Sequence, residues 1–207
     1  MVNILHIDSS PRAERSHSRE LSKEFVSGWR AAHPEDAIAY RDLGHHPVPH
    51  VNEPWVAAAF SPPETHTPEL TEAIRISNEL VDEFLAADRY VFGVPMYNFN
   101  IPSTFKAYID QIVRINRTVA LDGQGGFKGL VEGKKAVIIT ARGGDFKATS
   151  PAAAYDFQEP YLRTIFGFIG LTDIQFINAN SLNEGDAART QSLSEGRTAI
   201  QDAIAQW

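Results

Sequence analysis

Short apolar runs alternate along the chain with longer stretches in which apolar residues recur every three or four positions. The short runs are rich in β-branched and aromatic residues and predict strands at 2–7, 37–42, 90–94, 135–141 and 174–177. The longer stretches predict amphipathic helices at 18–32, 67–85, 102–113, 160–170 and 187–207. Strands that alternate with helices predict an α/β protein with a mostly parallel sheet of five strands and helices on both faces.

The third of these runs has no polar alternation, which is typical of a central strand buried on both faces. A loop of five residues follows it: Pro95, Met96, Tyr97, Asn98 and Phe99. Ligands of open parallel sheets bind outside the carboxyl ends of the strands. An aromatic ring, an amide side chain and backbone N–H groups at that place favour a flat ring with heteroatoms at its edge, such as a flavin. The alternative is a loop whose aromatic residues only cover the sheet edge.

The loop after the first strand is rich in hydroxyl groups. Ser10, Ser16, His17 and Ser18 lie where the first helix begins, and we expect Ser18 to be its N-cap. Hydroxyls and backbone N–H groups at a helix N-terminus form a phosphate site without any glycine motif. The alternative is an ordinary turn in which one serine caps the helix.

A third candidate loop, Ala141 to Gly144, follows the fourth strand. Gly143 and Gly144 permit positive φ and close approach of the backbone to a ligand, and Arg142 brings positive charge to the same rim. The alternative is a plain glycine-rich turn. In the flavodoxin-like strand order 2-1-3-4-5, all three loops lie side by side at one edge of the sheet.

Two long excursions, at 43–67 and 116–133, interrupt the alternation. The first has no periodicity and predicts a lid or a subunit contact, whereas the second is glycine-rich and predicts a strand pair or flap. Trp55, Val56 and Phe60 lie in the first excursion, where such large apolar side chains need a partner surface. A two-fold contact between identical subunits is the commonest way to bury such a patch, so we expect a homodimer.

Composition narrows the classes of function. The 207 residues are 43% hydrophobic and 22% charged, which predicts one globular domain over residues 1–207. A net charge of −7 without a Lys/Arg cluster disfavours nucleic acid as a partner. The chain has no cysteine, so disulfide and thiolate chemistry are excluded and any redox chemistry requires a cofactor.

Two further classes are not expected. No apolar run approaches the length of a membrane span, and the first residues lead straight into a strand, so we expect a cytoplasmic protein without membrane attachment. His45, His46 and His50 lack a carboxylate or cysteine at ligand spacing, so we predict no metal site.

The loops together resemble those of the FMN-dependent NADH-azoreductase family, within the flavodoxin-like NAD(P)H:quinone reductases. The resemblance extends over the full length and is strongest in Ser9-Ser10, Ser16-His17-Ser18, Pro95-Met-Tyr-Asn-Phe-Asn100, Arg142-Gly-Gly144 and Pro160-Tyr-Leu…Phe166-Gly-Phe-Ile-Gly170. It implies a bound FMN whose phosphate is held by Ser10 and by Ser16 to Ser18. Met96 to Phe99, with Pro95 beside them, would border the flavin ring, and Ala141 to Gly144 would close its pyrimidine side.

The resemblance also implies an activity. NADH would pass a hydride to the flavin and leave, and a quinone or an aromatic azo compound would then take two electrons in a ping-pong sequence. The family works as a homodimer with its substrate pocket between subunits, which would put Phe60, Val119 or Leu121 near the acceptor. The competing interpretation is a flavodoxin-like electron carrier or a flavin-binding regulatory protein without turnover. Carriers are shorter and more acidic, and they lack long loops that build a substrate pocket.

Overall fold

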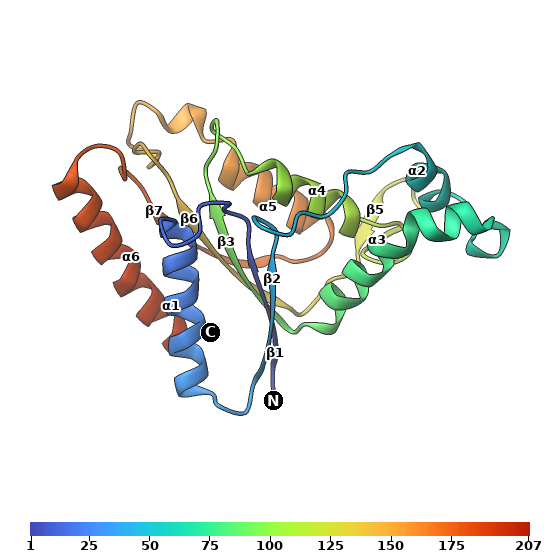
Figure 1. Ribbon diagram of the computed structural model, residues 1–207, viewed down its shortest axis with the longest axis horizontal. Coiled ribbons are helices and arrows are strands. Elements are labelled where there is room, and N and C mark those ends of the chain that lie inside the picture. Colours follow the sequence, from blue (N-terminus) through green and yellow to red (C-terminus); the bar gives the residue numbers. More distant parts are fainter.

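A twisted parallel sheet of five strands runs through the middle of the computed structural model, which describes residues 1–207 (Figure 1). The strands lie in the order β2-β1-β3-β6-β7. Their bounds are Asn3–Asp8 for β1, Ala37–Asp42 for β2, Arg89–Pro95 for β3, Lys135–Ala141 for β6 and Asp173–Ala179 for β7. Numbered within this sheet alone, the order is 2-1-3-4-5, so the predicted fold class and strand order are confirmed.

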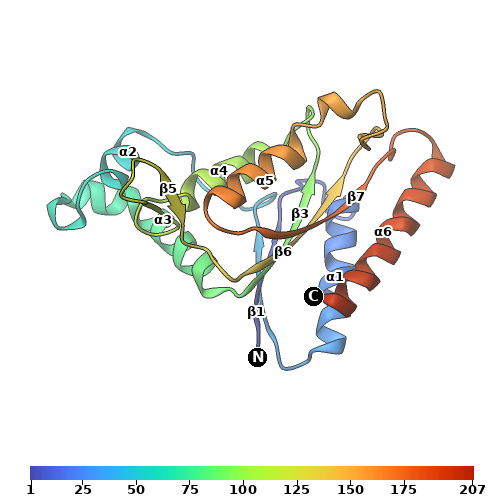
Figure 2. The same ribbon diagram turned by 180° about the vertical axis from the view of Figure 1, so that it is seen from behind.

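Helices cover both faces of this sheet (Figures 1 and 2). Those on one face are α1 (His17–Ala32) and α6 (Asp186–Gln206). Those on the other are α3 (Pro68–Ala86), α4 (Ser103–Ile112) and α5 (Gln158–Phe168). The N-cap of α3 is Thr67, whose side chain accepts from the backbone N–H of Leu70, as the sequence Thr-Pro-Glu predicts.

The N-cap of the first helix lies two residues earlier than predicted. This N-cap is Ser16, with an extended backbone and a side chain that accepts from the backbone N–H of Arg19. Ser18 lies inside the first turn, so its prediction as N-cap is wrong. Three serine or histidine residues in a row leave the cap ambiguous, because serine suits the cap position in either place.

The two faces of the sheet bury separate cores, because side chains alternate along each strand. In β3, Tyr90 and Phe92 pack with the helices α3, α4 and α5, whereas Val91 packs with Phe25 and Trp29 of α1. The strand is therefore buried on both faces, as its unbroken apolar run predicts. This burial fixes the position of the loop that follows it.

The first excursion contains regular structure that the sequence pattern did not indicate. A seven-residue helix, α2 (Glu53–Ala59), packs on α3, and together they project from one end of the molecule (Figure 1). Trp55 is buried there and donates its indole N–H to Oε1 of Gln111 at 2.8 Å. The expectation of a segment without regular structure is therefore wrong. Val56, in the middle of α2, and Phe60, its C-cap, are exposed.

The second excursion forms the expected strand pair. The strands β4 (Val119–Leu121) and β5 (Phe127–Gly129) pair antiparallel outside the main sheet. Only glycine fits at position 129, because a Cβ there would lie 2.2 Å from the backbone nitrogen of Gly170. The hairpin is thus held against the end of α5.

Candidate functional site

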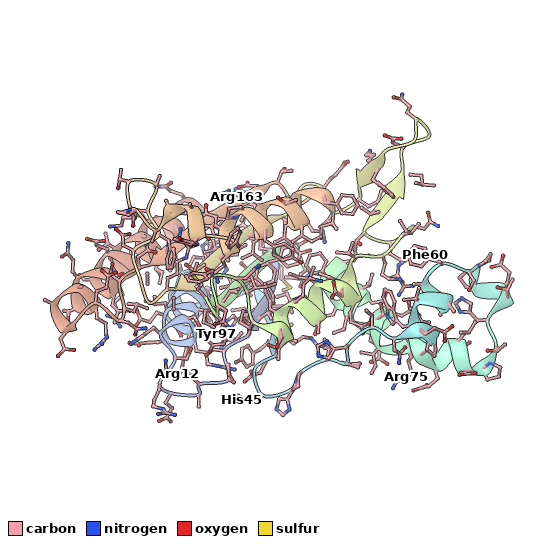
Figure 3. All side chains as sticks on the ribbon, turned by 90° about the horizontal axis from the view of Figure 1, so that it is seen from above. Arg12, His45, Phe60, Arg75, Tyr97 and Arg163 are labelled. Atoms are coloured by element: carbon pink, nitrogen blue, oxygen red, sulfur yellow. The ribbon has the colours of Figure 1, made fainter.

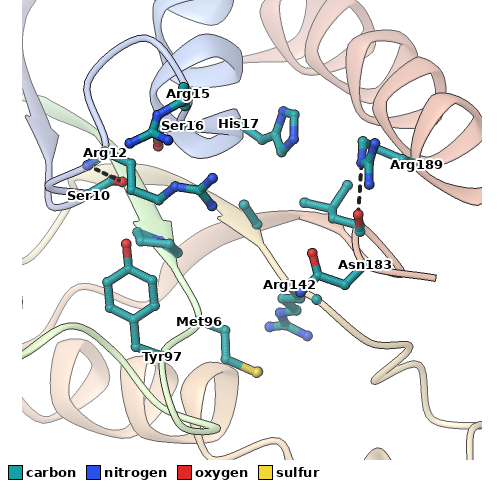
Figure 4. Close-up of a pocket in the computed structure, with 14 residues that line it drawn as sticks. Ser10, Arg12, Arg15, Ser16, His17, Met96, Tyr97, Arg142, Asn183 and Arg189 are labelled. Atoms are coloured by element: carbon teal, nitrogen blue, oxygen red, sulfur yellow. Dashed lines mark hydrogen bonds between the residues drawn. The ribbon is translucent and has the colours of Figure 1, made fainter. Parts of the chain in front are cut away.

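A cavity of about 560 Å³ opens where β1, β3 and β6 end at their carboxyl edge (Figure 4). It lies at the edge of the sheet where the strand order predicts a ligand site. Nine of the thirteen residues that we predicted to hold a cofactor line it: Ser10, Ser16, His17, Pro95, Met96, Tyr97, Ala141, Arg142 and Gly143. The other four do not line it, namely Ser18, Asn98, Phe99 and Gly144.

The loop between β1 and α1 brings donor groups to this cavity. Ser10 Oγ accepts from the backbone N–H of Arg12 at 3.3 Å, and its own hydroxyl hydrogen remains free to turn toward the cavity. The backbone N–H groups of His17 and Ser18 form no hydrogen bond within the protein, as expected in the first turn of a helix. Ser18 does not line the cavity, and its side chain is buried with Oγ 3.2 Å from Ser16 Oγ.

The charge of the cavity comes from arginines and not from any carboxylate. Arg12, Arg15, Arg142 and Arg189 line it, and no aspartate or glutamate does. Arg12 and Arg15 are exposed and form no ion pair, whereas Arg189 is paired with Asp186 at 2.8 Å. Figure 4 shows Arg12 extending across the opening toward the side that holds Arg189.

The loop after β3 makes a tight reversal. Tyr97 and Asn100 exchange two backbone hydrogen bonds of 2.8 and 3.0 Å, and the two residues between them, Asn98 and Phe99, have φ of 49° and 68°. Two successive positive φ values define a type I′ turn, which is uncommon for a residue as large as phenylalanine. The turn directs Met96 and Tyr97 to the cavity (Figure 4) and leaves Asn98 and Phe99 exposed. Such strain is often found at binding sites.

The loop after β6 differs from the prediction in two respects. The guanidinium of Arg142 is 2% exposed, with Nη1 3.0 Å from Asp156 Oδ2 and Nε 3.1 Å from Gln158 Oε1. Its charge is therefore compensated by a carboxylate, and the expectation of free positive charge on the rim from this residue is wrong. Gly143 and Gly144 both avoid positive φ, so neither is required for that reason.

The glycine at 143 instead permits close approach of a neighbouring loop. A Cβ at Gly143 would lie 2.7 Å from the side-chain nitrogen of Asn183, whose backbone N–H donates to the Gly143 carbonyl at 2.9 Å. The segment after β7 thereby reaches the cavity with Leu182 and Asn183. Its contribution was missed because nothing in its sequence marks it as a ligand loop.

Arg12 and Arg15 were also missed. A signal was present, since they are the only basic residues between Ser10 and Ser16 and they flank a predicted phosphate site. Arg189 carried no such signal, because it lies one turn into α6, a helix far along the sequence from all three predicted loops.

The three residues predicted near the acceptor lie apart from the cavity. Phe60 is 75% exposed at the far end of α2, distant from Tyr97 (Figure 3), and Leu121 is 67% exposed on the hairpin. Val119 is 1% exposed and belongs to the main core. Val119 is therefore a packing residue and offers no surface to a substrate, whereas Phe60 and Leu121 remain predictions.

The structure shows neither a metal centre nor a membrane-spanning helix. No three histidine, aspartate or glutamate side chains converge on a point where they would coordinate a metal ion. None of the helices combines the length and the apolar character needed to cross a membrane.

Comparison with known proteins identifies the family. Residues 2–204 match the protein family described by its flavodoxin-like fold. Over its full 207 residues the chain is 92% identical to the FMN-dependent NADH:quinone oxidoreductase of Nostoc punctiforme, and both chains are covered completely. It is 64% identical, again with complete coverage of both chains, to FMN-dependent NADH:quinone oxidoreductase 2 of Trichormus variabilis.

A solved structure agrees with these relatives. The azoreductase of Bacillus anthracis superposes with a TM-score of 0.92 at 26% identity, with all of both chains covered. The resemblance inferred from the loop motifs is therefore confirmed. The chain belongs to the flavodoxin-like family of FMN-dependent NADH:quinone oxidoreductases and azoreductases.

Proposed function

We propose that this protein is an FMN-dependent enzyme that uses NADH to reduce quinones and to cleave aromatic azo compounds. The observation that carries the proposal is the carboxylate-free cavity at the ends of β1, β3 and β6. Its volume of about 560 Å³ lies within the ~300–1,000 Å³ typical of cofactor sites. The names of the relatives supply the donor and the acceptor class.

The end of the cavity at α1 fits a phosphate. Two backbone N–H groups, those of His17 and Ser18, have no partner in the protein and lie at the positive end of the helix dipole. Arg12 and Arg15 add two uncompensated positive charges. A phosphomonoester carries about −1.5 to −2 charges at neutral pH, so the donor set and its charge match that group.

The other end fits a flat ring with polar edges. Met96 and Tyr97 offer an apolar and an aromatic surface, and Gly143, which also lines the cavity, has a backbone N–H without an acceptor in the protein. The backbone N–H groups of Phe99 and Gly144, on the same two loops, also have no acceptor in the protein. Unpaired donors beside an apolar surface match the carbonyl oxygens and ring nitrogens of a flavin. We assign Met96 to Phe99 and Ala141 to Gly144 to the ring on this ground.

A bound FMN would supply the capacity to accept two electrons from NADH and to give them to an acceptor. The chain itself would bind and orient the cofactor, because a flavin carries the electron transfer and no carboxylate lines the cavity. Buried partners hold the loops in place for this task. Gln158, for example, is fully buried and joins Arg142 Nε to the Val94 carbonyl, with bonds of 3.1 and 3.2 Å. Such bonds fix two loops relative to each other before any ligand enters.

We further propose a single domain, residues 1–207, that works as a cytoplasmic homodimer. Support for the dimer comes from apolar side chains left exposed on the projecting parts: Val56, Phe60, Leu121 and Phe127. The absence of cysteine fits a reducing compartment. Phe60 and Leu121 would reach the acceptor only across such a dimer contact.

The first prediction concerns turnover. One exposed ring face would serve NADH and acceptor in turn, so double-reciprocal plots for NADH at several menadione concentrations should be parallel. Intersecting lines would indicate a ternary complex. An electron carrier or a flavin-binding regulator would give no menadione-dependent NADH oxidation, and this result would reject the enzyme.

The second prediction concerns the phosphate end. Replacing Arg12 and Arg15 together by glutamine removes both uncompensated charges, and bonds to charged groups contribute ~1.5–3 kcal/mol each before solvent screening. We expect FMN to bind at least about tenfold more weakly, with little change for riboflavin, which lacks the phosphate. Fluorescence titration of the apoprotein measures both. Lys23→Gln with Arg30→Gln is the matched control, because these exposed cations of α1 do not line the cavity.

The third prediction concerns assembly. Light scattering should give about twice the chain mass of 22.9 kDa at assay concentrations. Glutamate in place of Val56 and Phe60 should shift the mass toward the monomer, because a charge in an apolar contact is costly to bury. A monomeric wild-type protein would contradict the proposed dimer.

A further inference from the structure

Arg19 connects the candidate phosphate loop to a neighbouring loop without lining the cavity itself. It lies in the first turn of α1, and its Nε donates to the carbonyl oxygen of Ser10 at 2.7 Å. Its Nη1 donates to Asp42 Oδ2 at 2.9 Å, and Nη2 donates to the other oxygen of the same carboxylate. One planar guanidinium thus joins the loop after β1 to the end of β2.

This connection is well supported on the side of β2. The side chains of Arg19 and Asp42 are 12% and 15% exposed. Asp42 also accepts from the backbone N–H groups of Gly44 and His45, each at 3.1 Å. Burial opposes ionisation of Asp42, but the hydrogen bonds from Arg19 and His45 outweigh it and hold the pKa of Asp42 well below its ordinary value. The carboxylate is therefore charged at every pH where the protein would work.

The bond to Ser10 decides which way that peptide faces. The carbonyl oxygen of Ser10 is held behind the loop, on the side of Arg19, while the residue lines the cavity in front. A carbonyl oxygen turned toward the cavity would repel a phosphate, because it is the negative end of the peptide dipole and the phosphate is an anion. Gly44 shows how closely the two loops approach, since a Cβ there would lie 2.1 Å from the Ser10 oxygen.

We propose that Arg19 is a positioning residue for the phosphate of the cofactor: it holds the Ser10 carbonyl away from the phosphate site and so sets the loop from Ser10 to Ser16 before binding. The inference rests on the proposed function, because it assumes that this loop receives the FMN phosphate. Arg19 acts through the loop and contributes no contact of its own to the cavity.

A purely structural ion pair makes a different prediction. If Arg19 only stabilised the fold, its loss would weaken the binding of all flavins alike, because the whole site would become less ordered. If Arg19 positions the phosphate loop, its loss weakens the binding of FMN and leaves the binding of riboflavin almost unchanged. Riboflavin has the same ring and side chain as FMN but no phosphate. The ratio of the two dissociation constants separates the two roles.

The experiment uses two variants of the full-length protein. Arg19→Lys keeps the charge but removes the planar Nε–H that reaches Ser10, and Asp42→Asn keeps Arg19 but weakens its anchor. Flavin fluorescence titration of each apoprotein gives the dissociation constants for FMN and for riboflavin. We expect the FMN constant to rise at least about fivefold in Arg19→Lys and to rise less in Asp42→Asn, with riboflavin changed less than about twofold.

Arg41→Gln is the matched control. Arg41 precedes Asp42 in β2, and its Nε pairs with Glu83 Oε2 at 2.6 Å in a partly buried bond that does not involve Ser10. Its loss should leave the ratio of the two constants as in the wild type. Thermal unfolding of all the variants measures how much stability each substitution costs, independently of the ligands.

The outcomes divide clearly. A lower preference for FMN over riboflavin in both variants, but not in Arg41→Gln, supports the positioning role. Equal loss for both flavins, or no loss for either, overturns it. A wild-type protein that binds neither flavin rejects the proposed function itself, and this result is read from the wild type alone.

Discussion

The register of the parallel hydrogen-bond ladder is the constraint on which the site depends. The ladder continues past the strand ends: Ser9 donates its backbone N–H to the Gly93 carbonyl, Met96 to Ala141, and Arg142 to Ala179, at 3.1, 2.9 and 2.8 Å. Each candidate loop is therefore tied to the next strand at its first residue. These bonds hold three loops from distant parts of the sequence in fixed positions relative to one another. A shift of any one loop would break a hydrogen bond of the ladder.

Charge is distributed unevenly between the cavity and the rest of the protein. The chain carries a net charge of −7, yet the cavity has arginines and no carboxylate. Arg142, which is buried, and Arg19, which is largely buried, are paired with Asp156 and Asp42. Their charges are compensated, so they orient backbone without attracting a ligand. Arg12 and Arg15, which line the cavity and are exposed, form no ion pair and are therefore available to an anion.

Local sequence predicted those features that depend on local physics. The strands at 37–42 and 135–141 agree residue for residue with β2 and β6, and the β-branched run of β6 is typical of a buried strand. The helix α2 was missed because seven residues are too few for a helical period to appear. The direction of the Arg142 side chain was also missed, since its partners Asp156 and Gln158 come from a distant helix start. For the same reason no motif marked Arg19 or Asn183.

The central claim is that the three loops form an FMN site, and the freshly purified protein tests it most directly. Its visible absorption spectrum and the identity of the cofactor released on denaturation should be measured together, with the amount of cofactor expressed per chain. We expect a yellow protein with one FMN per chain, or a colourless apoprotein that takes up one equivalent of added FMN. A protein that neither contains FMN nor binds it when it is added would show that the three loops do not form an FMN site.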